Sequence, residues 1–220
     1  MKKDITHYRF LASLFDYPQA DYTDRMLAAQ RQLDERFPEA AALLRPFTEF
    51  MSGANLAVQQ ELFLRSFDVQ AVTTLDLGYV LFGDDYKRGE LLVNLNREHR
   101  EAENDCGVEL SDHLPNVLRL LPKLNDAELV NELANRIIGP ALYRMIRGFE
   151  PEQVELKDKF YQKQHKTLIE RPSDHYTIFQ KLLEALYAVL NADFGIEEKE
   201  LAEKTSDFLK NINTEAALES

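Results

Sequence analysis

The chain has 220 residues, the length of one ordinary domain with a substantial hydrophobic core. Its 26 lysine and arginine residues stand against 38 aspartate and glutamate residues, so the formal net charge is −12 at pH 7. This balance argues against general binding to nucleic acids or anionic membranes, because like charges repel and no basic patch offsets them. It favours a basic partner, such as a peptide with lysine or arginine, although acidity also serves as a general aid to solubility.

The cysteine content and the N-terminal residues indicate in which cellular compartment the protein is expected. Cys106 is the single cysteine, which excludes an intramolecular disulfide and a cysteine-rich metal site. Its acidic neighbours raise the pKa of a thiol, so Cys106 is a poor candidate nucleophile. The N-terminal residues lack the apolar core of a secretory signal, and no apolar run of membrane-spanning length follows. We therefore expect a cytoplasmic protein.

Apolar residues at helical spacing predict a series of helices in the first half of the chain. Asp4 or Thr6 can cap the first helix, and the Tyr17-Pro18 step ends it, because the residue before a proline avoids helical backbone angles. Further helices are predicted over about residues 22–36, 39–51, 56–67, 75–82 and 86–105.

Several capping residues follow from this pattern. Thr73 or Thr74 is the expected N-cap of the short helix at 75–82, and Gly107 the expected C-cap of the long helix at 86–105. Asp112 is the expected N-cap of the next helix, with Pro115 in its first turn, where a missing N–H does no harm. The residues of the long helix expected to face inward are Leu91, Leu92, Leu95, His99 and Ala102.

The second half continues in the same manner. Asn125 or Asp126 is expected to cap a helix that runs to about residue 147 with a kink at Pro140. Residues 151–172 are polar and lysine-rich, and we expect an exposed helix or an ordered connector there. The clearest amphipathic helix begins near residue 176 and is closed by Gly195. A last helix is predicted over about residues 197–209.

These patterns predict an all-α fold, a single bundle-like domain of about nine to eleven helices. We expect the domain to cover residues 1–210 and residues 211–220 to form a disordered tail. No internal repeat of fixed period is present, which argues against a solenoid.

No motif for catalysis or cofactor binding stands out. The histidines do not form a metal-binding pair, and the spacing of His99 and Glu103 lacks the third ligand that a catalytic metal site normally requires. The sequence has no GxSxG, no GxGxxG and no P-loop. We therefore expect a protein that is not an enzyme and holds no cofactor or metal. The five histidines are His7, His99, His113, His165 and His175.

Two local features remain open to more than one interpretation. Asp112 and His113 stand at a predicted helix start, where they can form the edge of a groove or simply an N-cap beside an exposed histidine. Aromatic side chains flank two turns, where they can bind a ligand or pack in the core. These aromatic residues are Phe63, Phe67, Tyr79, Phe82 and Tyr86.

The central part of the chain resembles the NarJ-type assembly chaperones of nitrate reductase, within the wider TorD/DmsD group of molybdoenzyme maturation chaperones. Three segments over about residues 55–121 carry the resemblance, together with the aromatic pattern of residues 8–18. They are QELFLRSFD at 60–68, GDDYKRG at 83–89 and ELSDHLP at 109–115. The chain after residue 151 matches the family pattern poorly.

The resemblance implies a chaperone without catalytic activity. Members of this family bind the N-terminal segment of a molybdenum-containing catalytic subunit, which is often basic and partly apolar. They hold it in the cytoplasm until the molybdenum cofactor and the iron–sulfur cluster are inserted. The partner implied here is such a peptide, with no nucleic acid and no membrane insertion, and the chaperone is a monomer or a helix-swapped dimer.

The resemblance also implies a peptide-binding groove at the Ser-Asp-His-Leu-Pro corner. The residues expected at this groove are Asp112, His113, Pro115, Glu61, Phe67, Tyr79 and Arg88. Arg88 has a structural alternative, an ion pair with Asp84 or Asp85. Two rival functions also remain: an enzyme with a pocket at Asp112 and His113, and a helical interaction adaptor unrelated to redox enzymes.

Overall fold

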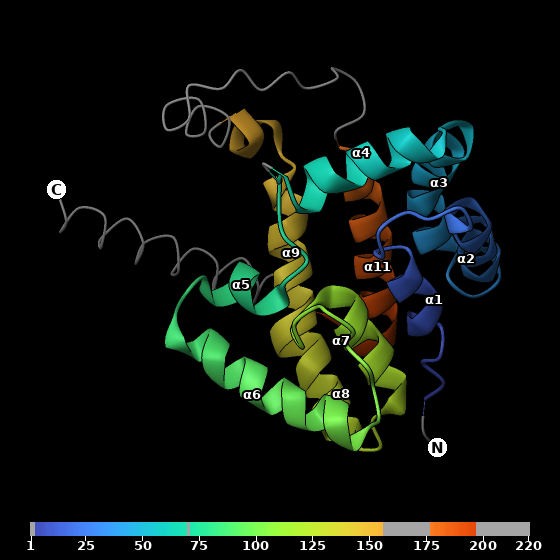
Figure 1. The fold of residues 1–220 in the computed structure, drawn as a ribbon. Coiled ribbons are helices and arrows are strands. Elements are labelled where there is room, and N and C mark those ends of the chain that lie inside the picture. The colour runs from blue at the N-terminus through green and yellow to red at the C-terminus, as the bar shows by residue number, and fades with distance from the viewer. Residues whose placement is uncertain (1–2, 70, 156–176, 197–220) are drawn as a thin grey trace, which may run out of the picture.

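Helices make up nearly all of the ordered secondary structure in the computed structural model, which describes residues 3–69, 71–155 and 177–196 (Figure 1). Within these ranges there are ten α-helices and two short segments of 3₁₀ and π geometry, and no strand. The predicted all-α fold of about nine to eleven helices is confirmed.

Most helices in the first half of the chain begin and end close to the predicted positions. They are α1 (Tyr8–Ser13), α2 (Tyr22–Arg36), α3 (Pro38–Gly53), α4 (Leu56–Phe67), α5 (Leu77–Phe82) and α6 (Tyr86–Glu101). The second half contains α7 (Leu114–Leu120), the 3₁₀ turn η1 (Leu121–Lys123), α8 (Ala127–Glu132), the π-helical segment η2 (Leu133–Ile138), α9 (Gly139–Gly148) and α11 (Ile178–Phe194).

Helix α11 lies at the centre of the bundle, between α3 and α9 (Figure 1). Its apolar residues are buried along most of its length, as its helical periodicity predicts. The ring of Phe179 packs edge-on against Phe47 of α3 and against Phe63 and Phe67 of α4, with ring centroids 5.1–5.7 Å apart. This aromatic cluster fixes α4 over the start of α11. Gly195 closes the helix in the left-handed conformation, as predicted.

The segment after α6 departs from the prediction. The helix ends at Glu101, four residues earlier than expected, and Glu103 adopts a positive φ of 49°. Gly107 is therefore not a helix cap, and its φ of 61° instead turns the loop that leads to α7. Leu95 and His99 are buried as predicted, whereas Leu91, Leu92 and Ala102 are only partly buried.

Three capping predictions also need correction. Helix α1 has His7 at its N-cap position without a side-chain cap, so neither Asp4 nor Thr6 caps it. It ends at Ser13, before the predicted end at the Tyr17-Pro18 step.

The short helix α5 begins at Leu77 with Asp76 as its N-cap residue, so neither Thr73 nor Thr74 has that role. Helix α7 has His113 at its N-cap position and no side-chain cap, so the predicted capping by Asp112 is wrong. Asp126 does cap α8, because its Oδ1 accepts hydrogen bonds from two backbone N–H groups.

The chain stays helical around Pro140, but with altered hydrogen bonding. Residues 133–138 form a π-helical segment that leads directly into α9, with Pro140 in the first turn of α9. A π-turn accommodates a proline because the wider turn displaces the carbonyl that the ring would otherwise strike. The predicted irregularity therefore appears as a π-segment before the proline.

Several predictions fall outside the described residues. These are the connector beyond residue 155, the last helix at 197–209 and the tail at 211–220. Among the helices of the described ranges, none combines the length and hydrophobicity that crossing a lipid bilayer requires.

Candidate functional site

A short backbone ladder joins the start of α5 to the start of α7. The N–H of Leu77 donates to the carbonyl oxygen of Asp112 at 2.9 Å, and the N–H of Leu114 donates to that of Leu75 at 2.8 Å. The result is an isolated antiparallel bridge between Asp76 and His113. Two segments far apart in the sequence are thus held side by side, with their polar side chains adjacent.

The carboxylate of Asp112 is completely buried behind this bridge. Its Oδ2 accepts a hydrogen bond from the backbone N–H of Gly78 at 3.1 Å and another from Nε of Arg88 at 3.2 Å. Gly78 permits this approach, because a Cβ at that position would lie 2.7 Å from Oδ2. A buried carboxylate is costly unless a cation compensates it, so Asp112 and Arg88 form a structural pair.

Arg88 links this buried pair to the surface. One of its terminal nitrogens donates to Asp76 Oδ2 at 3.0 Å, and its guanidinium lies over the ring of Tyr79, 5.3 Å from the centroid. The alternative prediction gives Arg88 a structural role in an ion pair with Asp84 or Asp85. Arg88 does form structural ion pairs, but its partners are Asp76 and Asp112. In sequence the true partners lie 12 residues before Arg88 and 24 residues after it.

Asp76 connects Arg88 to His113. Nδ1 of His113 donates to Oδ1 of Asp76 at 3.1 Å, while Oδ2 of Asp76 faces Arg88. The hydrogen bond from His113 lowers the pKa of Asp76 below its ordinary value, and with the help of Arg88 it outweighs burial, which acts to raise that pKa. Asp76 is therefore a carboxylate that the fold keeps ionised.

An open groove of about 580 Å³ lies in front of this network. Its walls are formed by residues 15–17 after α1, the second half of α4, the residues before α5, the loop at 106–109 and one face of α7. Its volume lies within the range of about 300–1,000 Å³ typical of ligand-binding pockets. Its apolar lining residues include Phe15, Tyr17, Phe63, Phe67, Leu75, Val108 and Pro115.

A hydrogen-bonded core holds the loop wall of the groove in place. His99 of α6 is buried, its Nε2 donates to the carbonyl oxygen of Ser111 at 3.0 Å, and its Nδ1 accepts from the amide of Asn104 at 2.9 Å. The amide of Asn116 donates to the carbonyl oxygens of Cys106 and Leu110. Burial lowers the pKa of His99, against the opposing effect of its bond to Ser111. His99 is thus a neutral structural residue.

The loop held by this core presents the side chain of Val108 to solvent. Val108 lines the groove and is 99% exposed, at the tip of a loop fixed by Asn116. The side chain of Val108 therefore leaves apolar surface at the groove that a bound molecule can cover.

The structure brings together three of the seven predicted groove residues. Phe67, His113 and Pro115 line the groove, although Phe67 is also buried in the aromatic cluster of the core. Asp112 and Arg88 lie behind the groove wall and do not line it.

The other two predicted residues lie at the surface outside the groove. Glu61 is exposed on α4 and forms an ion pair with Arg65 one turn away, at 2.7 Å. Tyr79 is 46% exposed and contacts the guanidinium of Arg88.

Sequence reasoning missed several residues of the groove, including two, Asp68 and Glu109, that lie within the segments resembling the chaperone family. Arg119 forms a short ion pair with Asp16 across the groove wall, from positions 103 residues apart. Asp68 follows the last residue of α4, and Glu109 projects from the loop. No local pattern shows that these side chains meet at the groove, since their relation depends on how α1, α4 and α7 pack.

Two observations concern metal binding and thiol chemistry at the described residues of the groove. In the described ranges no three histidine, cysteine, aspartate or glutamate residues lie together in a way that could hold a metal ion. The thiol of Cys106 lines the groove, but burial and the charge of Asp105 raise its pKa, which disfavours the reactive thiolate.

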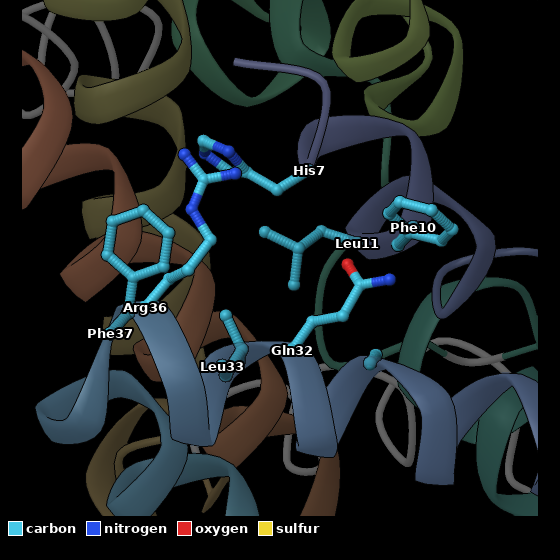
Figure 2. Close-up of a pocket in the computed structure, with 8 residues that line it drawn as sticks. His7, Phe10, Leu11, Gln32, Leu33, Arg36 and Phe37 are labelled. Atoms are coloured by element: carbon cyan, nitrogen blue, oxygen red, sulfur yellow. The ribbon is translucent and has the colours of Figure 1, made fainter. Parts of the chain in front are cut away.

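A second, much smaller cavity lies between the start of α1 and the end of α2 (Figure 2). Its volume is about 10 Å³, which is the space of a single water molecule. His7 lines it and is held by a 2.7 Å contact between its Nε2 and Oδ2 of Asp193 at the end of α11. The cavity is too small for a ligand, so this pair serves to tie the N-terminal segment to α11.

No protein-family model matches the chain, and no curated protein matches it.

Proposed function

We propose that this protein is a cytoplasmic chaperone that binds the N-terminal segment of a molybdenum-containing, nitrate reductase-like catalytic subunit. It holds that segment while the molybdenum cofactor and the iron–sulfur cluster are inserted. The proposal combines the resemblance of residues 55–121 to the NarJ-type chaperones with the groove beside Asp76 and His113. The groove is the single structural observation that carries the binding role.

Three properties of the groove support a peptide as its occupant. It reaches the surface, where the exposed Val108 and Glu109 line it, and its volume suits several side chains of a chain segment. Its lining combines aromatic and aliphatic side chains with carboxylates, which suits a partly apolar, basic peptide. The whole protein carries a net charge of −12, which attracts a basic segment from a distance.

The burial of Asp112 weighs against the rival proposal of an enzyme. Its carboxylate has no solvent-exposed surface and is engaged by Gly78 and Arg88. A general base must come within hydrogen-bond distance of its substrate, and Asp112 lies behind the groove wall. A binding role uses the groove surface without requiring Asp112 to move.

Affinity capture with the tagged full-length protein tests the proposal. We expect recovery of a molybdenum-containing catalytic subunit from cells that express it, and loss of recovery when the N-terminal segment of that subunit is deleted. A synthetic peptide with the sequence of that segment is then titrated by calorimetry. Absence of binding at low ionic strength, where charge attraction is strongest, would overturn the proposal.

Matched valine variants test whether the groove is the binding surface. Val108→Ser removes an exposed apolar side chain of the groove, whereas Val93→Ser makes the same change on the outer face of α6. Loss of buried apolar area predicts about three- to tenfold weaker binding for Val108→Ser. Val93→Ser is expected to bind like the wild type. Equal effects of the two changes would place the binding surface elsewhere.

A further inference from the structure

Four carboxylates line the groove, and two of them are already engaged by cations of the protein itself. Asp16 pairs with Arg119 and lies 3.6 Å from Arg25. Asp76 pairs with Arg88 at 3.0 Å and with His113 at 3.1 Å. These two carboxylates shape the groove, and a bound cation would have to compete with their internal partners.

The other two carboxylates, Asp68 and Glu109, differ in this respect. Both side chains are exposed, and neither forms an ion pair or a side-chain hydrogen bond within the part of the chain that the structure describes. They come from different walls of the groove, Asp68 from the end of α4 and Glu109 from the loop at 106–109. Both carboxylates are therefore available to a ligand.

The surroundings strengthen the negative potential at Asp68. This residue is the C-cap of α4, where its N–H donates to the carbonyl oxygen of Leu64. The carboxyl end of a helix carries a partial negative charge, so the α4 terminus adds to the attraction that Asp68 exerts on a cation. Glu109 lies next to the apolar Val108, so a cation at Glu109 can accompany an apolar side chain on Val108.

We propose that Asp68 and Glu109 select the charge of the bound peptide, which carries lysine or arginine beside its apolar residues. This inference rests on the proposed function and deepens it, because it names the two residues that recognise the basic groups. Pairing with these carboxylates breaks no internal ion pair, whereas pairing with Asp16 or Asp76 must displace Arg119 or Arg88. The apolar residues of the peptide contact Phe63, Pro115 and Val108.

Selection from a random-peptide phage library tests this inference without a known client. The full-length wild type and the Asp68→Asn/Glu109→Gln double variant are the two baits. We expect the wild type to enrich peptides that combine apolar with basic residues, and the double variant to lose the basic preference. Enrichment of apolar peptides with no basic preference by the wild type would overturn the inference and leave the peptide groove intact. No enrichment by either bait would overturn both.

Affinities of the selected peptide supply the quantitative test. Exposed ion pairs contribute modestly, so we expect the double variant to bind about three- to tenfold more weakly at low salt. The matched control is Asp24→Asn/Glu49→Gln, which makes the same change in net charge at exposed positions of α2 and α3 outside the groove.

The two charge variants separate local from general attraction. The control is expected to bind within about twofold of the wild type, because a distant charge is screened over roughly 10 Å. Equal weakening in both double variants would overturn the inference, since net charge alone would then account for the effect. Glu109→Gln by itself keeps the end of α4 unchanged, and it is expected to give part of the loss.

Discussion

His113 and Asp76 stand 37 positions apart in the sequence, and their side chains meet at 3.1 Å on the wall of an open groove. A backbone bridge between the same two residues fixes this contact. Behind it, Arg88 joins Asp76 to the buried Asp112. The groove wall is therefore held by a chain of charges that extends from the surface into the core.

Loss of Arg88 is expected to destabilise the fold far more than neutralisation of Asp112. Arg88→Met leaves the buried carboxylate of Asp112 without its cation, at a cost of about 3–5 kcal/mol. Asp112→Asn keeps an oxygen for Gly78, and Arg88 retains Asp76, so we expect a cost of about 1–2 kcal/mol. Urea unfolding of both variants measures the difference.

The ion pair between the exposed Arg97 and the partly buried Glu98 provides the control for these variants. Arg97 is 60% exposed, and Arg97→Met is expected to change the unfolding free energy by less than about 0.5 kcal/mol. Similar losses for Arg88→Met and Arg97→Met would contradict a structural role for the buried pair.

Two glycines near the network predict opposite effects of the same substitution. Gly78→Ala would place a Cβ 2.7 Å from Oδ2 of Asp112 and 3.1 Å from a side-chain carbon of Arg88. The carboxylate must then shift, so we expect a loss of about 1–3 kcal/mol. Gly89→Ala in α6 meets no atom within 4 Å, and it is expected to stabilise the helix by about 0.5–1 kcal/mol. Thermal unfolding of both variants gives the sign, and destabilisation by Gly89→Ala would be the contrary result.

The hydrogen bond from His113 makes the stability of the groove wall depend on acid pH. The pKa of Asp76 in the folded protein lies below its ordinary value of 3.8, so the folded state favours the ionised form. This stabilisation is present above the unfolded pKa and is lost as the pH falls through the folded pKa. The difference in unfolding free energy between wild type and Asp76→Asn should therefore shrink below about pH 4. If this difference in unfolding free energy did not change with pH, the charge of Asp76 would not stabilise the fold.

A second effect of pH on stability, at higher pH than that of Asp76, is expected from His99. Burial holds its pKa below the ordinary value of 6.5, because the folded protein favours the neutral ring that bonds Ser111 and Asn104. The stabilisation is complete above the unfolded pKa and is lost as the pH falls through the lower folded pKa. His99→Gln should therefore be destabilised relative to wild type at about pH 7.5, by an amount that decreases toward about pH 5. Parallel pH profiles would contradict this assignment.

The sequence by itself determined the helices, because each buries one face and apolar residues recur at the helical period. Helices α2 and α4 begin and end where the pattern predicts, and Gly195 ends α11 as expected. Local interactions also identified Asp126 as a cap, since the two backbone N–H groups that donate to its carboxylate lie within three residues of it. Where capping depended on more distant residues, as at Asp112, the prediction failed.

Only the tertiary structure decided which polar side chains meet. The partners of Arg88, the pairing of Arg119 with Asp16 and the availability of Asp68 and Glu109 all depend on the packing of helices distant in sequence. A sequence motif showed that Asp112 and His113 stand together at a helix start. Asp112 is buried beside the Arg88 cation, whereas His113 lies on the groove wall. This difference follows from the bridge between the two segments, because adjacent side chains of an extended backbone point in opposite directions.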